Sequence, residues 1–222
     1  MIKQAWAIGL MTLCLGTQVH AQAALGRNLI VNGDAESGMA GWTAFDGYDL
    51  FQSVDYGSNW VLPTQPGPTN RGTKMFAGLN ARAAGYQLLD LGELSQQSLS
   101  YDLSGWLGGW TTQTDNAMLY VSFLDASSAE IGSAALGPVM PGDRNNATGL
   151  ILVQSHGLLP TGTTSLMFSV SMERFNGGDN DGYADNLSFT LSAAPVPEAQ
   201  SLAYALVGLG LVGGLLGQRR RG

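Results

Sequence analysis

Hydrophobic and polar residues alternate along several short stretches of this chain, with turn-forming residues between them. The clearest stretch is residues 98–110, in which Leu99, Tyr101 and Leu103 alternate with polar residues. Alternation with a period of two is typical of a strand that has one buried face. Residues 98–110 therefore predict a half-buried strand.

Shorter stretches of the same character predict the other strands. They are residues 28–32, 41–45, 50–56, 74–79, 85–91, 117–125, 130–136, 149–155, 165–174 and 183–191. Residues 61–72 contain three prolines, which are excluded from central strands, and predict a loop. About ten short strands, with no helix-length amphipathic pattern between the two ends, predict an all-β fold. We expect a single β-sandwich or barrel over residues 24–194 rather than a βαβ fold.

The two ends of the chain have a different pattern. Residues 1–23 combine Lys3, an apolar run and small residues at Ala21 and Ala23, which predicts a signal peptide cut after one of these alanines. Residues 201–217 are uncharged, and as a helix they would be roughly 25 Å long, close to the bilayer core of about 30 Å. The apolar run predicts a transmembrane helix, and the arginines that follow it predict that the C-terminal end of this helix is cytoplasmic.

Charge limits the ligands of the central domain. The chain has 17 acidic and 10 basic residues, and three of the basic ones form the cluster 219–221. The region between the two ends is therefore strongly acidic and lacks the basic face that binds nucleic acid. It suits a surface protein that binds a divalent cation or a neutral polysaccharide.

Cysteine and histidine chemistry is almost excluded by composition. The single cysteine, Cys14, lies in the predicted signal peptide, so the mature chain has no disulfide, thiol nucleophile or cysteine-ligated metal. His156 is then the only histidine, which excludes a zinc site built on histidines. No nucleophile motif accompanies His156, so we do not expect a Ser–His–Asp triad. We expect His156 to lie in a surface turn.

The C-terminal segment 195–222 resembles the PEP-CTERM sorting signal of Gram-negative bacteria, which is also labelled the ice-binding protein C-terminal domain. The resemblance rests on the motif Val196-Pro197-Glu198, the apolar glycine-rich helix and the terminal arginines; Ala199 replaces the usual proline. The residues that carry the sorting signal would be Val196, Pro197, Glu198, Arg219, Arg220 and Arg221. The resemblance implies that an exosortase recognises and cleaves this segment. The precursor would then lie in the inner membrane, and the processed protein at the cell surface or in the extracellular matrix.

The central domain resembles the galactose-binding-like jelly rolls, which include many carbohydrate-binding modules. The resemblance rests on residues 28–42, with their Asn-Gly-Asp and Gly-Trp motifs, and on residues 180–191. Asp185 has the parity of Tyr183 and Leu187 and is expected to point inward, where a lone carboxylate needs a partner. The resemblance implies a structural Ca²⁺ between the first and last strands, which the oxygens of Asp34, Glu36 and Asp185 would bind. The alternative is that Asp185 caps or hydrogen-bonds nearby backbone.

Aromatic residues supply a second candidate chemistry. The residues able to stack on sugar rings are Tyr48, Tyr56, Trp60, Trp106 and Trp110. We single out Trp60 and Trp110, because turn-forming residues surround them and an exposed loop aromatic is a binding hint. Trp42 is expected in the core.

Three functions are open at this point. The first is a non-catalytic surface or matrix protein that is exported and sorted by its C-terminal signal. The second is a carbohydrate-binding module that recognises exopolysaccharide. A glycoside hydrolase ranks last, because that reaction needs two placed carboxylates and no pair stands out.

Overall fold

The alternating pattern folds into ten antiparallel strands in the computed structural model, which describes residues 23–57 and 59–195. The strands are β1 (Thr43–Ala44), β2 (Gln52–Asp55), β3 (Lys74–Ala77), β4 (Arg82–Asp90), β5 (Leu99–Gly109), β6 (Asn116–Leu124), β7 (Glu130–Leu136), β8 (Gly149–Leu158), β9 (Ser165–Glu173) and β10 (Tyr183–Ala193). Two short 3₁₀ helices, η1 (Gly92–Gln96) and η2 (Pro141–Arg144), lie in the connections.

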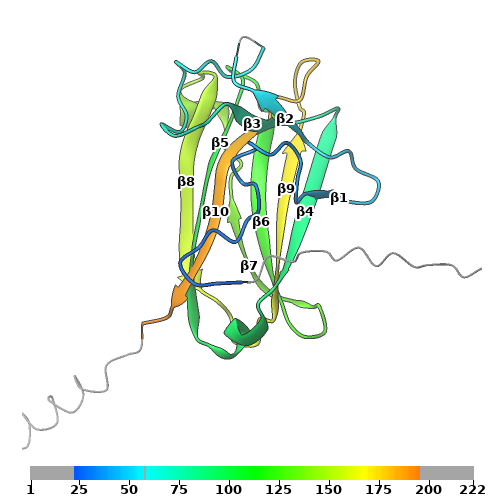
Figure 1. Cartoon of the computed structure of the whole chain (residues 1–222). Helices are drawn as coiled ribbons and strands as arrows, with labels where there is room; N and C mark the ends of the chain where they lie inside the picture. Colours follow the sequence, from blue (N-terminus) through cyan, green and yellow to red (C-terminus); the bar gives the residue numbers. More distant parts are fainter. Residues whose placement is uncertain (1–22, 58, 196–222) are drawn as a thin grey trace, which may run out of the picture.

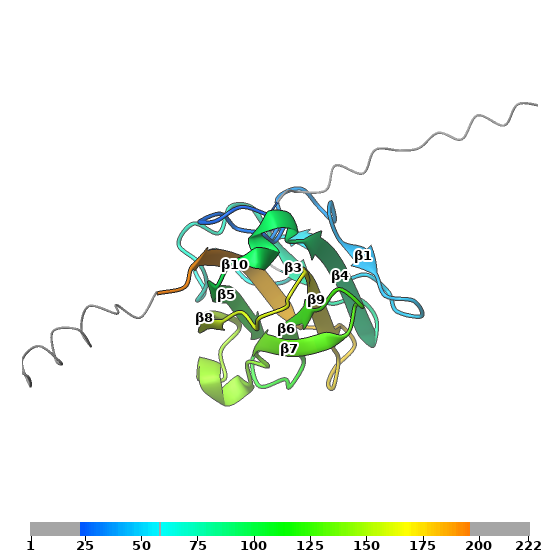
Figure 2. The same cartoon turned by 90° about the horizontal axis from the view of Figure 1, so that it is seen from below.

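The strands form two five-stranded sheets that face each other (Figure 1). The first sheet has the order β1-β4-β9-β6-β7 and the second the order β2-β3-β10-β5-β8. Seen from below, the two sheets are stacked as layers (Figure 2). The prediction of an all-β sandwich is therefore confirmed.

The main hydrophobic core lies between the two sheets. Strand β5 contributes Leu99, Tyr101 and Leu103, the inward set that its alternation predicts. The ring of Phe189 on β10 stacks on Tyr101 at 5.5 Å between centroids and contacts Phe168 of the opposite sheet at 5.3 Å. Aromatic contacts across the two inner faces thus hold the layers together.

A smaller hydrophobic cluster lies on the outer face of the second sheet. It consists of Val61, Met75, Ala77, Leu150 and Tyr183, all buried. The described residues of the loop 56–72, which contains the predicted proline-rich loop, cover this part of the sheet: Val61 belongs to the cluster, and Leu150 N donates to the carbonyl of Pro66. The outer face of the second sheet is therefore part core and part surface.

The segment 26–33 replaces the predicted strand 28–32. It runs beside β10 with hydrogen bonds from Gly26 N to Leu191 O and from Leu187 N to Gly33 O. Asn32 has a positive φ of 51°, which interrupts an extended strand. A Cβ at Gly33 would lie 2.1 Å from the carbonyl oxygen of Leu187, so only glycine allows this close approach.

The helices expected at the two ends of the chain lie outside the described residues. Within residues 23–57 and 59–195, no helix is long and apolar enough to cross a membrane. The signal peptide, the transmembrane helix at 201–217 and the sorting signal stay predictions.

Candidate functional site

A β-bulge in β10 decides which way its acidic residue points. The pairing of β10 with β5 shifts between Asp185 and Ser188, and Asn186 there has a φ of 46°. Ala184 and Leu187 consequently face the main core, whereas Tyr183 belongs to the outer cluster. The expectation that Asp185 points between the sheets is wrong: it is buried, but on the outer face of the second sheet.

The Asp185 carboxylate has its own protein donors. The hydroxyl of Tyr56 donates to Oδ2 at 2.6 Å, and the backbone N–H of Asn186 donates to Oδ1 at 2.7 Å. Burial raises the pKa of Asp185 to about 7, and the nearby charges of Asp34 and Glu36 add to this increase. The Tyr56 bond ties the loop 56–72 to the bulge.

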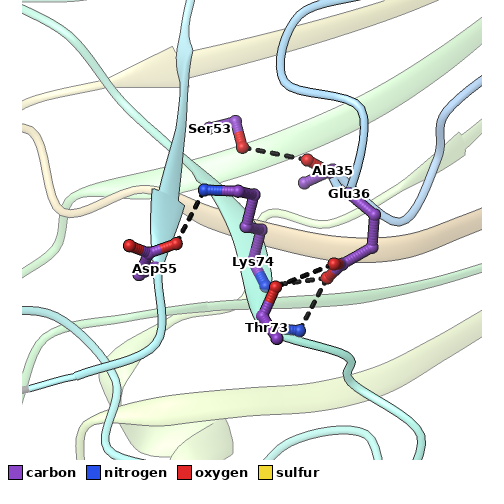
Figure 3. Close-up of polar contacts among 6 residues, drawn as sticks. All are labelled: Ala35, Glu36, Ser53, Asp55, Thr73 and Lys74. Atoms are coloured by element: carbon purple, nitrogen blue, oxygen red, sulfur yellow. Dashed lines mark hydrogen bonds and ion pairs between the residues drawn. The ribbon is translucent and has the colours of Figure 1, made fainter.

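Glu36 fastens the N-terminal segment to the start of β3 (Figure 3). Its carboxylate accepts hydrogen bonds from Thr73 N at 2.7 Å, Thr73 Oγ1 at 2.8 Å and Lys74 N at 2.8 Å. Beside it, Ser53 Oγ donates to the carbonyl of Ala35 at 2.9 Å. The pKa of Glu36 is lowered by these bonds, because they favour the ionised form.

The predicted calcium ligands lie in one region of the fold, but chain donors occupy two of them. Both oxygens of Glu36 and both oxygens of Asp185 already accept hydrogen bonds. Asp34 is exposed, and its Oδ1 accepts only a long bond of 3.4 Å from Glu36 N. In the described part of the chain, no group of three or more His, Cys, Asp or Glu side chains is placed to hold one metal ion. The calcium site stays a prediction.

Removing calcium provides a direct test of that site. If Asp34, Glu36 and Asp185 bind the ion, the thermal midpoint of the full chain falls when a chelator replaces calcium, because an ion bound only to the folded state stabilises it. Asp34→Asn should weaken this effect, and Asp46→Asn, an exposed aspartate in another turn, should not. Equal midpoints in calcium and in chelator would contradict the prediction.

A groove crosses the outer face of the second sheet beside the outer cluster. It has a volume of about 510 Å³ and is open to solvent. Its lining comes from β8, β5, β10, the segment 26–34 and the loop 56–72. The residues used below are Leu152, Trp106, Ser104, Ser188, Asn186, Asn70 and Asp34. Because strands are spaced by about 4.8 Å, the floor from β8 to the segment 26–33 is about 14 Å wide.

Trp106 is the aromatic side chain of the groove. It points outward from β5, directly opposite Leu152 on β8, and packs partly against the outer cluster. The alternation of residues 98–110 places Trp106 on the outward face, so the sequence held a signal for its orientation. Trp60 and Trp110 were predicted as the binding aromatics because turn-forming residues surround them, and strand parity was not considered.

Polar side chains lie beside Trp106 on the groove floor. Ser104 and Ser188 are opposite each other on β5 and β10. Asn186 Nδ2 donates to Asn70 Oδ1 at 3.1 Å, which joins the bulge of β10 to the covering loop. An aromatic ring beside hydroxyl and amide groups is the usual composition of a site that binds a polar ligand with an apolar face.

The predicted binding aromatics lie elsewhere. Trp60 and Trp110 are half-buried and pack against the outer cluster; Trp60 meets Tyr183 edge to face at 6.1 Å. Neither lines the groove. Trp42 is buried, as predicted, with its ring 5.2 Å from that of Phe51.

Two further residues differ from expectation. His156 is exposed as predicted, but it lies on strand β8 and not in a turn. Asp181, for which the run Asp179-Asn180-Asp181-Gly182 predicts a solvated turn, is buried and accepts a hydrogen bond from Tyr183 Oη at 2.5 Å. Burial raises the pKa of Asp181. The Asp181 carboxylate thus provides the hydrogen-bond acceptor for the buried hydroxyl of Tyr183 in the outer cluster.

Comparisons with known proteins identify similar folds without placing the chain in a family. No family model matches the sequence, and no curated protein matches it. The enzymatically active domain of tailspike protein 4 from bacteriophage CBA120 is similar over 74% of this chain and 21% of that chain, at 15% identity and a TM-score of 0.52. This chain therefore corresponds to about a fifth of the tailspike chain, and the similarity shows a shared fold.

Carbohydrate-binding modules are also among the similar structures. A family 16 module is 25% identical, with 73% of this chain and 99% of that chain covered and a TM-score of 0.48. A family 61 module, determined in complex with β-1,4-galactotriose, is 15% identical, with 75% and 99% covered and a TM-score of 0.46. The assignment of this chain to the galactose-binding-like jelly rolls stays a prediction.

Proposed function

We propose that this domain is a carbohydrate-binding module whose groove on the second sheet binds a polysaccharide. The observation that supports this most is Trp106, which lies in an open groove beside Ser104 and Ser188. A sugar ring has an apolar face and a rim of hydroxyl groups. An aromatic ring with hydroxyl and amide groups around it satisfies both.

The groove suits binding better than catalysis. Asp34 is the only acidic side chain among the described residues that line it. Glycoside hydrolysis by the usual mechanisms needs two carboxyl groups across the bond that breaks. The acidic character of the domain also disfavours acidic glycans, because like charges repel. We therefore propose a neutral polysaccharide as the ligand.

A ligand of this class agrees with the predicted export of the chain. We propose that the domain meets its polysaccharide at the cell surface or in the extracellular matrix, after sorting by an exosortase. Residues 195–222 carry this part of the proposal, through the sequence motif alone.

Titration of the full chain with oligosaccharides tests the binding function. Neutral β-linked xylo-, cello- and galacto-oligosaccharides should include a ligand, and polygalacturonate should bind less. Trp106→Ala should lower the affinity about 30-fold, because a central tryptophan contributes about 2 kcal/mol at a binding site. Isothermal titration calorimetry measures both quantities.

The control is Tyr120→Ala, an exposed aromatic on β6 in the other sheet. This variant should bind as the wild type does, and circular dichroism should show both variants folded. No binding to any oligosaccharide, or equal affinities for Trp106→Ala and wild type, would refute the proposed site. Cleavage of an oligosaccharide by the wild type would refute the assignment as a non-catalytic module.

A further inference from the structure

Strand β8 forms a long, unprotected edge of the second sheet (Figure 1). It has ten residues, and none of them is Lys, Arg, Asp, Glu or Pro. Sheet edges in proteins are usually kept from pairing with other chains by shortness, charge, proline or a bulge. The other three edges have such features: β1 has two residues, β2 has four and includes Asp55, and β7 includes Glu130 and pairs through a bulge.

The register of β8 shows which backbone groups point away from the sheet. Leu159 N donates to Leu99 O of the neighbouring segment at 2.8 Å, so the odd-numbered residues face β5. The backbone N–H and C=O groups of the even-numbered residues 152, 154, 156 and 158 therefore point away from β5, out of the edge. The side chains of these four residues are exposed. Their N–H and C=O groups make no hydrogen bond within the part of the chain that the structure describes.

The free stretch has defined limits. On one side, Leu150 N already donates to the carbonyl of Pro66 at 2.9 Å. On the other side, Pro160 has no N–H to donate. The pairing-competent edge is therefore residues 152–158, and its midpoint is Ser155.

We infer that β8 pairs antiparallel with β8 of a second copy of this chain, about a two-fold axis at Ser155. In this register Leu152 lies opposite Leu158 of the second copy, and Gln154 lies opposite His156. The leucines are 46% and 67% exposed, and pairing would cover both. These outward-facing residues of the two edges meet as hydrogen-bonded pairs. Because apolar residues then lie opposite apolar ones and polar residues opposite polar ones, the sequence of this edge is complementary to itself.

The pairing would enlarge the proposed ligand site. Leu152 lines the groove, so Leu158 of the second copy would lie beside the β8 end of the groove. The two second sheets would become one continuous ten-stranded sheet, with both grooves on the same face. A long polysaccharide could then contact two grooves at once, which raises avidity without new contacts within either groove. This consequence rests on the proposed function, whereas the dimer does not.

A charge placed on the edge tests the dimer. The full chain should sediment as a species of twice the monomer mass at micromolar concentration. Leu158→Lys should raise the dissociation constant at least tenfold, because a lysine at an edge must lose its hydration to pair. The matched control is Leu88→Lys, on the outer face of β4 and 58% exposed, which should leave the dimer intact.

Cross-linking tests the register. Residues at the two-fold axis form a non-hydrogen-bonded pair with a Cα–Cα distance of about 4.5 Å, within the range of a disulfide. In a Cys14→Ser background, Ser155→Cys should therefore form a covalent dimer under mild oxidation. Ser133→Cys, exposed on the opposite edge strand β7, should not.

Three results would overturn the inference. One is a monomer at all concentrations, as expected if another segment of the chain or another protein covers β8. Another is a dimer that Leu158→Lys does not weaken. The last is cross-linking no faster at Ser155→Cys than at Ser133→Cys. Oligosaccharide titration of the Leu158→Lys variant separates the two proposals, because a monomer that still binds keeps the proposed function.

Discussion

The variant Asp185→Asn is expected to keep its stability as the pH rises from 4 to 7, whereas the wild type is expected to become less stable over the same range. The pKa of Asp185 is raised from its ordinary value of 3.8 to about 7, chiefly by burial. Between these pH values the folded state binds more protons than the unfolded state, so the free energy of unfolding falls with increasing pH. The stabilisation is fully present below about pH 4 and lost above about pH 7. The difference corresponds to about 4 kcal/mol.

Urea unfolding of the wild type and Asp185→Asn at several pH values measures this effect. The two proteins should be similar in stability near pH 4, and the variant should be the more stable above pH 7. Asp125→Asn is a control of opposite sign, because hydrogen bonds from Ser127 and Ala129 lower the pKa of Asp125. Its stabilisation is present above the ordinary pKa and lost as the pH falls. A constant difference between wild type and Asp185→Asn at all pH values would contradict the prediction.

Replacing Arg144 with methionine is expected to destabilise the fold by about 3 kcal/mol or more. Its guanidinium is buried and donates to the carbonyls of Thr111 at 2.6 Å, Ala147 at 2.6 Å and Gln113 at 2.9 Å. Without the guanidinium these carbonyls lose a charged donor, and bonds to charged groups contribute about 1.5–3 kcal/mol each. Burial lowers the pKa of Arg144, which reflects the cost that these bonds offset.

Chemical denaturation of three variants separates charge from geometry. Arg144→Lys keeps the charge but not the planar fork that reaches several carbonyls, so it should also be strongly destabilised. Arg82→Met is the control, because Arg82 is exposed and its ion pair with Glu173 is a surface pair, which water screens so that it contributes little to stability. If Arg144→Met is no less stable than Arg82→Met, the guanidinium is not the link that holds these loops.

Most of the strands could be predicted from the sequence. The ranges predicted for residues 74–191 match β3 to β10 within three residues at each end. The largest difference at a C-terminal end is at residue 155, where β8 continues to Leu158 through the polar residues Ser155 and His156. The strand predicted at 28–32 was wrong, because its backbone turns at Asn32 although Ile30 and Val31 are β-branched.

The candidate site was only partly predictable. Trp106 was among the aromatics named, and its parity indicated an outward orientation. The groove around it brings together residues 28–34, 70, 104–106, 152 and 186–188, which are distant in the sequence. No local pattern shows that these segments meet, because strand order in a sheet depends on which long-range pairings bury the most apolar surface.

The sequence by itself determined the all-β class, the position of most strands and the acidic, cysteine-free character of the domain, because alternation and composition are properties of short segments. The tertiary structure alone decided three features. A single bulge reversed the side to which Asp185 points, the loop 56–72 turned part of an outer face into a second core, and the sheet order left β8 at an edge. Each depends on one residue of register or on one neighbouring segment, and a period-two pattern carries no information about either.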